Sequence, residues 1–307
     1  MLGKKVLILG GSSYVGKYLF SRLGTDKAIA TYCKTPIAGG IYFDSLTMKI
    51  SGILESPDKI SHAIILLGDT NPETCAEDAE KSNALNVDSI KSILKELKKL
   101  KIKPVFTSSE FIYDGKKGNY DENDPPNPIL LYGMQKLKIE KFIQDNFNDF
   151  IILRLAKVYG SDKGDKKLIM DWLKSIKNNK TISCASDQRF SPIYIEDVVK
   201  AIIKIVGKNP NGIFNLGSEK SYSRLEILNI LINSIRIFSQ IKINITARSI
   251  HDFDLKEKRP LDISMNSAKI VNEIGIKLTP VEIVCKNIAR KNFGGEENGK
   301  NIINRVE

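Results

Sequence analysis

The sequence is poor in the residues that build metal sites. Its 307 residues include only four cysteines and two histidines, His62 and His251. The cysteines lie far apart and no two form a CxxC pair, whereas structural zinc sites need closely spaced ligands. We therefore expect no metal, and we expect isolated and mostly buried thiols at Cys33, Cys75, Cys184 and Cys285.

Long apolar runs are also lacking. No run approaches the roughly 20 residues needed to span a bilayer, and the N-terminal MLGKKVLILG leads directly into a predicted strand. Hydrophobic residues make up 42% of the chain and charged residues 27%, which is typical of soluble globular proteins. We expect a cytoplasmic protein without membrane contact.

Positive charge, in contrast, is plentiful. The formal net charge is +11 and the sequence pI is about 9.3, a balance that would suit a nucleic-acid partner. The lysines, however, lie mostly on polar helix faces, as in SILKELKKLKIK over residues 92–103, with few aromatic residues between them. We expect no nucleic-acid partner, and interpret the charge as solvated surface that also attracts an anionic substrate.

The most informative stretch is VLILGGSSYVGKYLF, residues 6–20, which predicts a strand, a tight turn and a helix. Gly10 allows the sharp turn, Gly16 allows close helix packing, and the backbone N–H groups at the helix start would face a diphosphate. Ser13 stands where a GxxGxxG loop has its middle glycine. Such a loop alone is weak evidence, because it also forms ordinary turns. The predicted cofactor contacts here are Gly10, Ser12, Ser13, Tyr14 and Val15.

Strands and helices alternate after this motif. Further strands are predicted over residues 28–33, 40–43, 63–67, 104–107 and 151–155, and a helix over residues 75–100. The alternation predicts an α/β fold with a doubly wound, parallel Rossmann sheet, whose ligands lie at the carboxyl ends of the strands. The cofactor contacts predicted near those ends are Asp44, Gly68, Thr107, Ser108 and Leu155.

The end of the second strand bears on the choice of cofactor. In dinucleotide folds an acidic side chain at this place binds the ribose 2′-hydroxyl and repels a 2′-phosphate. This chain has Cys33 and Lys34 there. The missing carboxylate and the lysine favour NADP(H) over NAD(H), although Lys34 is equally well interpreted as ordinary loop surface.

Candidate catalytic groups follow the fifth predicted strand. Ser109 lies at its end, and after a turn-rich loop Tyr132 and Lys136 stand four residues apart on a predicted helix, hence on one face. Alone, such a pair is an ordinary amphipathic feature. Its coincidence with the glycine turn and the strand-end hydroxyl favours a catalytic interpretation.

The chain order predicts two unequal parts. Residues 1–160, together with 194–217, are expected to form the NAD(P)-binding Rossmann domain. Residues 161–193 and 218–292 are expected to form a smaller C-terminal substrate-binding subdomain. Residues 293–307 are polar and are predicted to be a flexible tail.

Up to about residue 291, the chain resembles the extended short-chain dehydrogenase/reductases, and most closely the dTDP-4-dehydrorhamnose reductase group. The resemblance is carried by GGSSYVG, TSSEFIYDG, YGMQKLKIE, LRLAKVYG, DQRFSPIYIEDV, GIFNLG and RPLDISMNSAKI, in this order. It implies that Tyr132 and Lys136 are the catalytic pair, with Ser109 in place of the usual threonine. It also implies NAD(P)H-dependent reduction of a 4-keto nucleotide sugar in deoxysugar or polysaccharide biosynthesis.

Those roles agree with elementary chemistry. Tyr132 would give a proton to the alkoxide that forms from a sugar ketone, and the ammonium of Lys136 would lower the pKa of that phenol by favouring phenolate. Ser109 would hydrogen-bond the carbonyl oxygen. The hydride itself comes from the cofactor.

The chain departs from the group at two positions expected to line the sugar pocket. Phe111 replaces a tyrosine, and Lys157 replaces an aromatic residue that often precedes VYG. We expect Phe111, Lys157 and Arg189 to contact substrate, with surface charge as the alternative interpretation of Lys157 and Arg189.

Three other functions remain in view. A dehydratase is disfavoured because Glu110 is followed by Phe111 instead of a second acid. An epimerase stays open, and so does a non-catalytic binding subunit, because proteins similar to this group serve as a regulatory subunit of methionine adenosyltransferase. Proteins of this group are often dimers, so a homodimer stays open as well.

Overall fold

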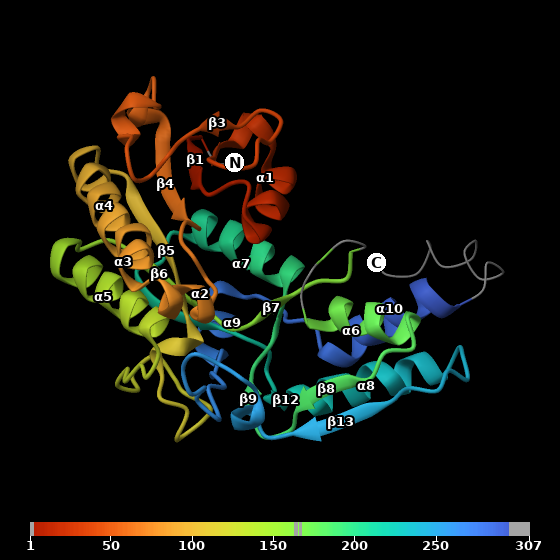
Figure 1. Ribbon diagram of the computed structural model, residues 1–307. Helices are drawn as coiled ribbons and strands as arrows, with labels where there is room; N and C mark the ends of the chain where they lie inside the picture. Colours follow the sequence, from red (N-terminus) through yellow and green to blue (C-terminus); the bar gives the residue numbers. More distant parts are fainter. Residues whose placement is uncertain (1–2, 163–164, 166–167, 295–307) are drawn as a thin grey trace.

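A seven-stranded sheet organises the N-terminal part of the molecule (Figure 1). The computed structural model describes residues 3–162, 165 and 168–294. The strands lie in the order β11-β6-β5-β4-β1-β2-β3, and every neighbouring pair is parallel. This confirms the predicted Rossmann sheet. Its strands are β1 (Lys5–Leu9), β2 (Ala28–Tyr32), β3 (Ile41–Tyr42), β4 (Ile60–Ile65), β5 (Lys103–Ser109), β6 (Ile151–Leu155) and β11 (Gly212–Leu216).

Helices cover both faces of this sheet. Side chains alternate along a strand, so Val6 and Ile8 of β1 pack with Leu19 on one face, whereas Leu7 and Leu9 pack on the other. The first face is covered by α1 (Tyr14–Lys27), α7 (Ile195–Lys208) and α9 (Ala268–Ile274), and the second by α4 (Ser89–Lys99) and α5 (Leu131–Asn146).

The prediction of a single helix over residues 75–100 is wrong in detail. The segment contains α2 (Pro72–Glu77), α3 (Ala79–Asn83), a π-helical turn (Ala84–Asp88) and α4. Asp78 separates the first two helices, because its backbone is not helical and its side chain accepts a hydrogen bond from Lys81 N. Short 3₁₀ turns occur at Ile50–Gly52, Pro57–Lys59, Glu110–Ile112 and Ile250–Asp252.

A second hydrophobic core lies among the C-terminal elements, at the lower right of Figure 1. It joins α6 (Leu168–Lys177), α8 (Arg224–Arg236) and α10 (Val281–Phe293), and it includes the buried Trp172. The predicted capping box of Ser223 and Glu226 at the start of α8 is confirmed. Short pairs border this part: β7 (Val158–Tyr159) with β10 (Ile193–Tyr194), β8 (Ile182–Ala185) with β13 (Ile245–Arg248), and β9 (Arg189–Phe190) with β12 (Tyr222–Ser223).

Two expectations from the sequence concern the C-terminal tail and contact with a membrane. Helix α10 includes Phe293, where the predicted tail begins, and residues 295–307 of that tail lie outside the described residues. Within the described ranges, no helix combines the length and apolar character needed to cross a membrane.

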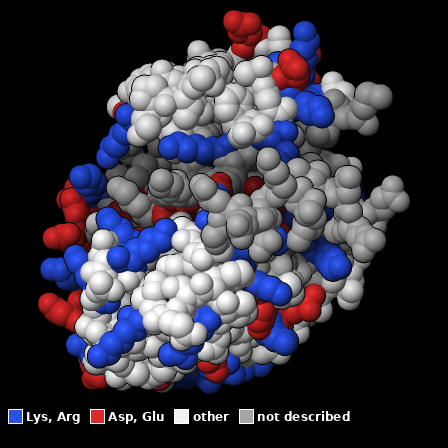
Figure 2. All heavy atoms as spheres, turned by 90° about the vertical axis from the view of Figure 1, so that its right-hand side faces the viewer, with Lys and Arg blue, Asp and Glu red and all other residues white. Residues whose placement is uncertain are grey.

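Figure 2 shows a face that is hollowed between an upper and a lower lobe, with Lys and Arg side chains along the edges of the hollow.

A buried ion pair joins the sheet to α5. Arg154 on β6 donates to Glu140 on α5 at 2.8 Å, and both side chains are almost fully buried. Arg154 also donates to the hydroxyl of Tyr113. The pair thus fixes α5, the helix that carries Tyr132 and Lys136, against the sheet.

We expect Glu140→Gln to lower the free energy of unfolding by about 3–5 kcal/mol, because it leaves the Arg154 charge buried and uncompensated. Glu196→Gln, which breaks the exposed pair with Arg22, is the matched control and should cost about 0–1 kcal/mol. Urea denaturation followed by circular dichroism measures both. Equal losses in the two variants would contradict the assigned role of the buried pair.

Candidate active site

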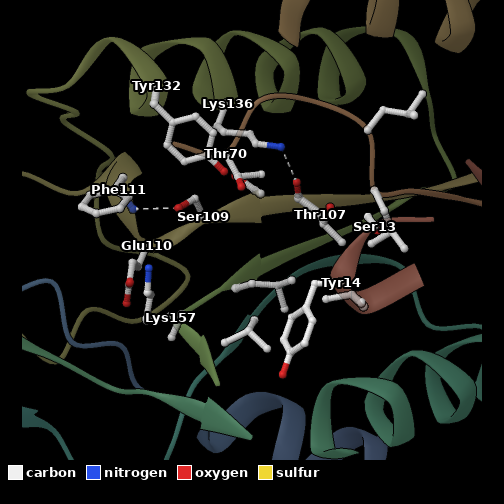
Figure 3. Close-up of a pocket in the computed structure, with 17 residues that line it drawn as sticks. Ser13, Tyr14, Thr70, Thr107, Ser109, Glu110, Phe111, Tyr132, Lys136 and Lys157 are labelled. Carbon is white, nitrogen blue, oxygen red and sulfur yellow. Dashed lines mark hydrogen bonds between the residues drawn. The ribbon is translucent and has the colours of Figure 1, made fainter. Parts of the chain in front are cut away.

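A pocket of about 200 Å³ lies at the carboxyl ends of the central strands (Figure 3). Its walls come from the start of α1, the loop after β4, the end of β5, helix α5 and the segment after β6. The predicted site residues among its lining are Ser13, Tyr14, Val15, Thr107, Ser108, Ser109, Phe111, Tyr132, Lys136, Leu155 and Lys157.

The turn after β1 is packed too closely for larger residues. Gly10 has a φ of +90°, and a Cβ atom on Gly16 would lie 2.2 Å from the Gly10 carbonyl oxygen. Ser13 caps α1, since its hydroxyl oxygen accepts a hydrogen bond from Gly16 N at 3.1 Å. Ser13 is expected to contact the cofactor, and its hydroxyl group also caps the N-terminus of α1. With Ser13, Tyr14 and Val15 on the pocket wall, the N-terminus of α1 fits the diphosphate of a dinucleotide.

Tyr132, Ser109 and Lys136 come together in this pocket. Tyr132 is buried, and the nearby Ser109 side chain favours its phenolate form. The Ser109 hydroxyl also accepts from Phe111 N at 3.3 Å, and the Phe111 ring stands edge-on to the Tyr132 ring. Lys136 Nζ donates to the Thr107 carbonyl oxygen at 2.9 Å and lies 5.7 Å from the centre of the Tyr132 ring.

The net pKa shift of Tyr132 runs opposite to the lowering that was expected from Lys136. Burial raises the pKa of Tyr132 above its ordinary value, and the hydrogen bond from Ser109 only partly opposes this. Burial also lowers the pKa of Lys136 to about 8, which weakens its cationic influence at neutral pH and above. Desolvation is the largest cause of both shifts, and Tyr132 keeps its proton at pH 7.

Glu110 is a pocket residue that the sequence did not single out as functional. It follows Ser109 directly and is 3% exposed. Burial raises the pKa of its carboxyl to about 8, although the charges of Lys157 and Arg224 and a hydrogen bond from the Lys157 backbone favour the carboxylate. The only feature of the sequence that pointed to Glu110 was its position directly after Ser109, and this position does not reveal that the side chain is buried.

A polar network behind helix α5 was also missed. Asn86, in the π-helical turn, donates to the side-chain oxygen of Gln135 at 2.8 Å and accepts from Asp69 N at 2.8 Å. At the start of α5, the Glu257 carboxylate accepts from Leu131 N at 2.9 Å. Residues 86 and 257 are far from α5 in sequence, so no local pattern could have linked them to it.

Six predicted site residues lie outside the lining of this pocket. Gly10 and Ser12 belong to the turn that supports it. Lys34 is exposed beyond the end of β2, and Asp44 is partly buried and accepts from Leu46 N. Gly68, with φ +128°, packs against Asn86. Arg189 forms an ion pair with Glu226 at 3.0 Å.

Comparison with known proteins identifies the family. The family model described as "RmlD substrate binding domain" matches residues 4–291. The chain belongs to this family. Among its relatives, the spore coat polysaccharide biosynthesis protein SpsK of Bacillus subtilis (strain 168) is 25% identical over 209 residues, which are 68% of this chain and 71% of that protein.

Two further similarities bear on function and fold. Methionine adenosyltransferase 2 subunit beta of Bos taurus is 23% identical over 210 residues, which are 67% of this chain and 63% of that protein, so the match spans less than two thirds of the relative. The dTDP-4-dehydrorhamnose reductase (rfbD) of Bacillus anthracis str. Ames, solved in complex with NADP, has a TM-score of 0.78 at 20% identity and covers 94% of this chain and 99% of its own. At this identity the likeness establishes only that the two chains share a fold.

The raised pKa of Glu110 predicts a pH-dependent stability. Between about pH 4.5 and 8 the native state retains a proton that the unfolded state releases, so this group makes the protein less stable as the pH rises. Glu110→Gln removes the effect. The stability of the variant relative to the parent should therefore increase from pH 5 to pH 8, by an amount on the order of a few kcal/mol.

Urea denaturation at pH 5, 6.5 and 8 measures this difference. Glu55→Gln, at an exposed carboxylate outside the pocket, controls for the loss of one negative charge. A Glu110→Gln variant whose relative stability stays flat over this range would show that Glu110 is ionised in the native state.

Proposed function

We propose that this protein is a nicotinamide-dependent reductase of a 4-keto nucleotide sugar. The supporting observation is the meeting of Ser109, Tyr132 and Lys136 in one pocket with the N-terminus of α1. Residues 1–160 with 194–217 would bind the cofactor, and residues 161–193 with 218–292 would hold the sugar nucleotide.

The roles of the side chains follow from their geometry. When bound, a reduced nicotinamide cofactor supplies the hydride; Ser13, Tyr14 and Val15 would hold its diphosphate and Lys136 its ribose. Tyr132 donates its phenolic proton to the oxygen of the reduced ketone. The high pKa of Tyr132 suits this direction, because the phenol stays protonated until the oxygen gains charge.

The names of two similar proteins support a nucleotide-linked sugar as the substrate class. The structural neighbour from Bacillus anthracis is a dTDP-4-dehydrorhamnose reductase, and the relative from Bacillus subtilis acts in polysaccharide biosynthesis according to its name. Both favour a nucleotide-linked keto sugar. The departures at Phe111 and Lys157 leave the identity of the sugar to experiment.

The direct test is spectrophotometric. Purified full-length protein is mixed with NADPH or NADH and a panel of 4-keto nucleotide sugars generated in situ by a dehydratase, and the nicotinamide absorbance is followed. Consumption of reduced cofactor with one sugar establishes the reductase. Binding of both cofactors with no consumption for any sugar overturns it.

Tyr132→Phe should lower kcat by at least about a hundredfold, because it removes the proton donor and keeps the aromatic ring. Affinity for the reduced cofactor, measured by fluorescence titration, should stay within about twofold of the parent. Tyr42→Phe, at an exposed tyrosine outside the pocket, should leave both quantities unchanged. Normal turnover by Tyr132→Phe would remove this residue from the mechanism.

We further propose that NADPH is preferred, on the basis of Lys34 beyond the end of β2. Lys34→Ala should weaken NADPH binding by about tenfold through loss of a charge-assisted phosphate contact, while NADH binding changes little. Lys27→Ala, at the opposite end of β2, is the matched control. An equal effect of Lys34→Ala on both cofactors would show that Lys34 does not contact the 2′-phosphate.

Two alternative functions, a binding subunit and an epimerase, predict different results in the same assay. The match to methionine adenosyltransferase 2 subunit beta favours a binding subunit as the second candidate. That function predicts cofactor binding without turnover, and a change in the activity of a methionine adenosyltransferase on mixing. An epimerase would convert a nucleotide sugar without net consumption of reduced cofactor.

A further inference from the structure

Helix α5 begins without a cap from its own sequence. The residue before its first turn is Leu130, whose apolar side chain forms no capping hydrogen bond. The first backbone N–H groups of an α-helix have no partner within the helix, and a polar side chain at the cap position usually accepts from one of them. Tyr132 is the second residue of α5, so its position depends on how this first turn is held.

A distant side chain, that of Glu257, supplies the missing acceptor. Leu131 N donates to Glu257 Oε1 at 2.9 Å, although the two residues are 126 positions apart. A carboxylate is a favourable acceptor at this place, because the N-terminus of a helix carries partial positive charge. The other carboxyl oxygen, Oε2, is buried and has no hydrogen-bond partner among the described residues. The hydrogen bond to α5 therefore compensates in part for the burial of this carboxyl group.

The segment that carries Glu257 is itself anchored. Glu73, in α2, accepts a hydrogen bond from Lys256 N at 2.9 Å and forms an ion pair with Arg259. Contacts on both sides of Glu257 thus end at one carboxylate of the N-terminal part. Glu257 is therefore held against the start of α5 by more than its own hydrogen bond.

The start of α5 is closely packed on the pocket side. A Cβ atom on Gly133 would lie 2.0 Å from the Phe111 carbonyl oxygen. Phe111 lies in the 3₁₀ turn directly after Ser109, and its ring stands edge-on to that of Tyr132. A shift of the first turn of α5 would therefore change the position of Tyr132 relative to Ser109.

We propose that Glu257 is a positioning residue, which caps α5 from a distant segment and thereby holds Tyr132 at the pocket. Its effect on turnover rests on the proposed reductase function, whereas the cap itself does not. The physical basis is that a displacement of a reacting group by about 1 Å can lower a rate by about a hundredfold.

Hydrogen exchange of the full-length protein, measured by mass spectrometry, tests the cap. In Glu257→Ala the amides at the start of α5 should exchange about fivefold faster than in the parent, the change expected for loss of a helix cap. The start of α8, which is capped by its own Ser223, should exchange at the parental rate. Unchanged exchange at α5 in a folded Glu257→Ala variant would overturn the inference.

Glu73→Ala tests the same arrangement from the other side. It should also speed exchange at the start of α5, because Lys256 and Arg259 lose their common partner. Added to Glu257→Ala, it should have little further effect, since both substitutions act through one contact. Fully additive effects on exchange, or no effect of Glu73→Ala at all, would overturn the arrangement.

Turnover separates the positioning of Tyr132 from general stability. Glu257→Ala should lower kcat by about tenfold and leave KM for the reduced cofactor within about twofold of the parent. Glu257→Gln keeps an acceptor oxygen and should restore kcat to within about twofold. Glu55→Ala, at an exposed carboxylate outside the pocket, is the control for the loss of an acidic side chain.

The outcomes distinguish this inference from the reductase proposal. A parental kcat in Glu257→Ala despite faster exchange would overturn the inference, since α5 would then be loosened without displacing Tyr132. Equal losses of kcat in Glu257→Ala and Glu257→Gln would overturn it as well, because the acceptor oxygen would then not matter. If the parent reduces no sugar, the reductase proposal fails, and hydrogen exchange alone decides whether Glu257 caps α5.

Discussion

The parallel register of the central strands is the constraint on which the whole site depends. Leu9 pairs with Ile65, Ile65 with Phe106, and Ser109 with Leu155, so β1, β4, β5 and β6 all end at the same edge. Each strand delivers its following residues to one pocket, although these residues are up to about 150 positions apart in the chain. The ion pair between Arg154 and Glu140 then fixes α5 over that edge.

Desolvation dominates the chemistry of the pocket. Burial raises the pKa values of Tyr132 and Glu110 and lowers that of Lys136. All three shifts favour the uncharged form, since a charged form loses hydration in a buried site. Clusters of shifted groups in a cleft are typical of functional sites. The same burial keeps the phenol of Tyr132 and the carboxyl group of Glu110 protonated at pH 7.

The sequence predicted what short-range patterns determine. The β1 turn, the parallel sheet and the placement of Tyr132 four residues before Lys136 follow from glycine spacing, apolar runs and helix periodicity. It could not predict the division of residues 75–100, which depends on a single cap at Asp78, nor the strand β13, which exists because it pairs with β8. The burial of Glu110 and the nearby charges of Lys157 and Arg224 were equally out of reach, since these residues come from segments far apart in the chain.

Contacts from the C-terminal part also hold helix α5, so the position of this helix depends on both parts of the chain. Glu257 accepts from the backbone of Leu131, the residue before Tyr132, and Arg259 forms an ion pair with Glu73 of α2. The segment that carries these two residues thus fixes the start of α5. A change in the position of this segment would move Tyr132, because the first backbone N–H of α5 is bound to it. The position of Tyr132 in the pocket therefore depends on contacts between residues that are far apart in the chain.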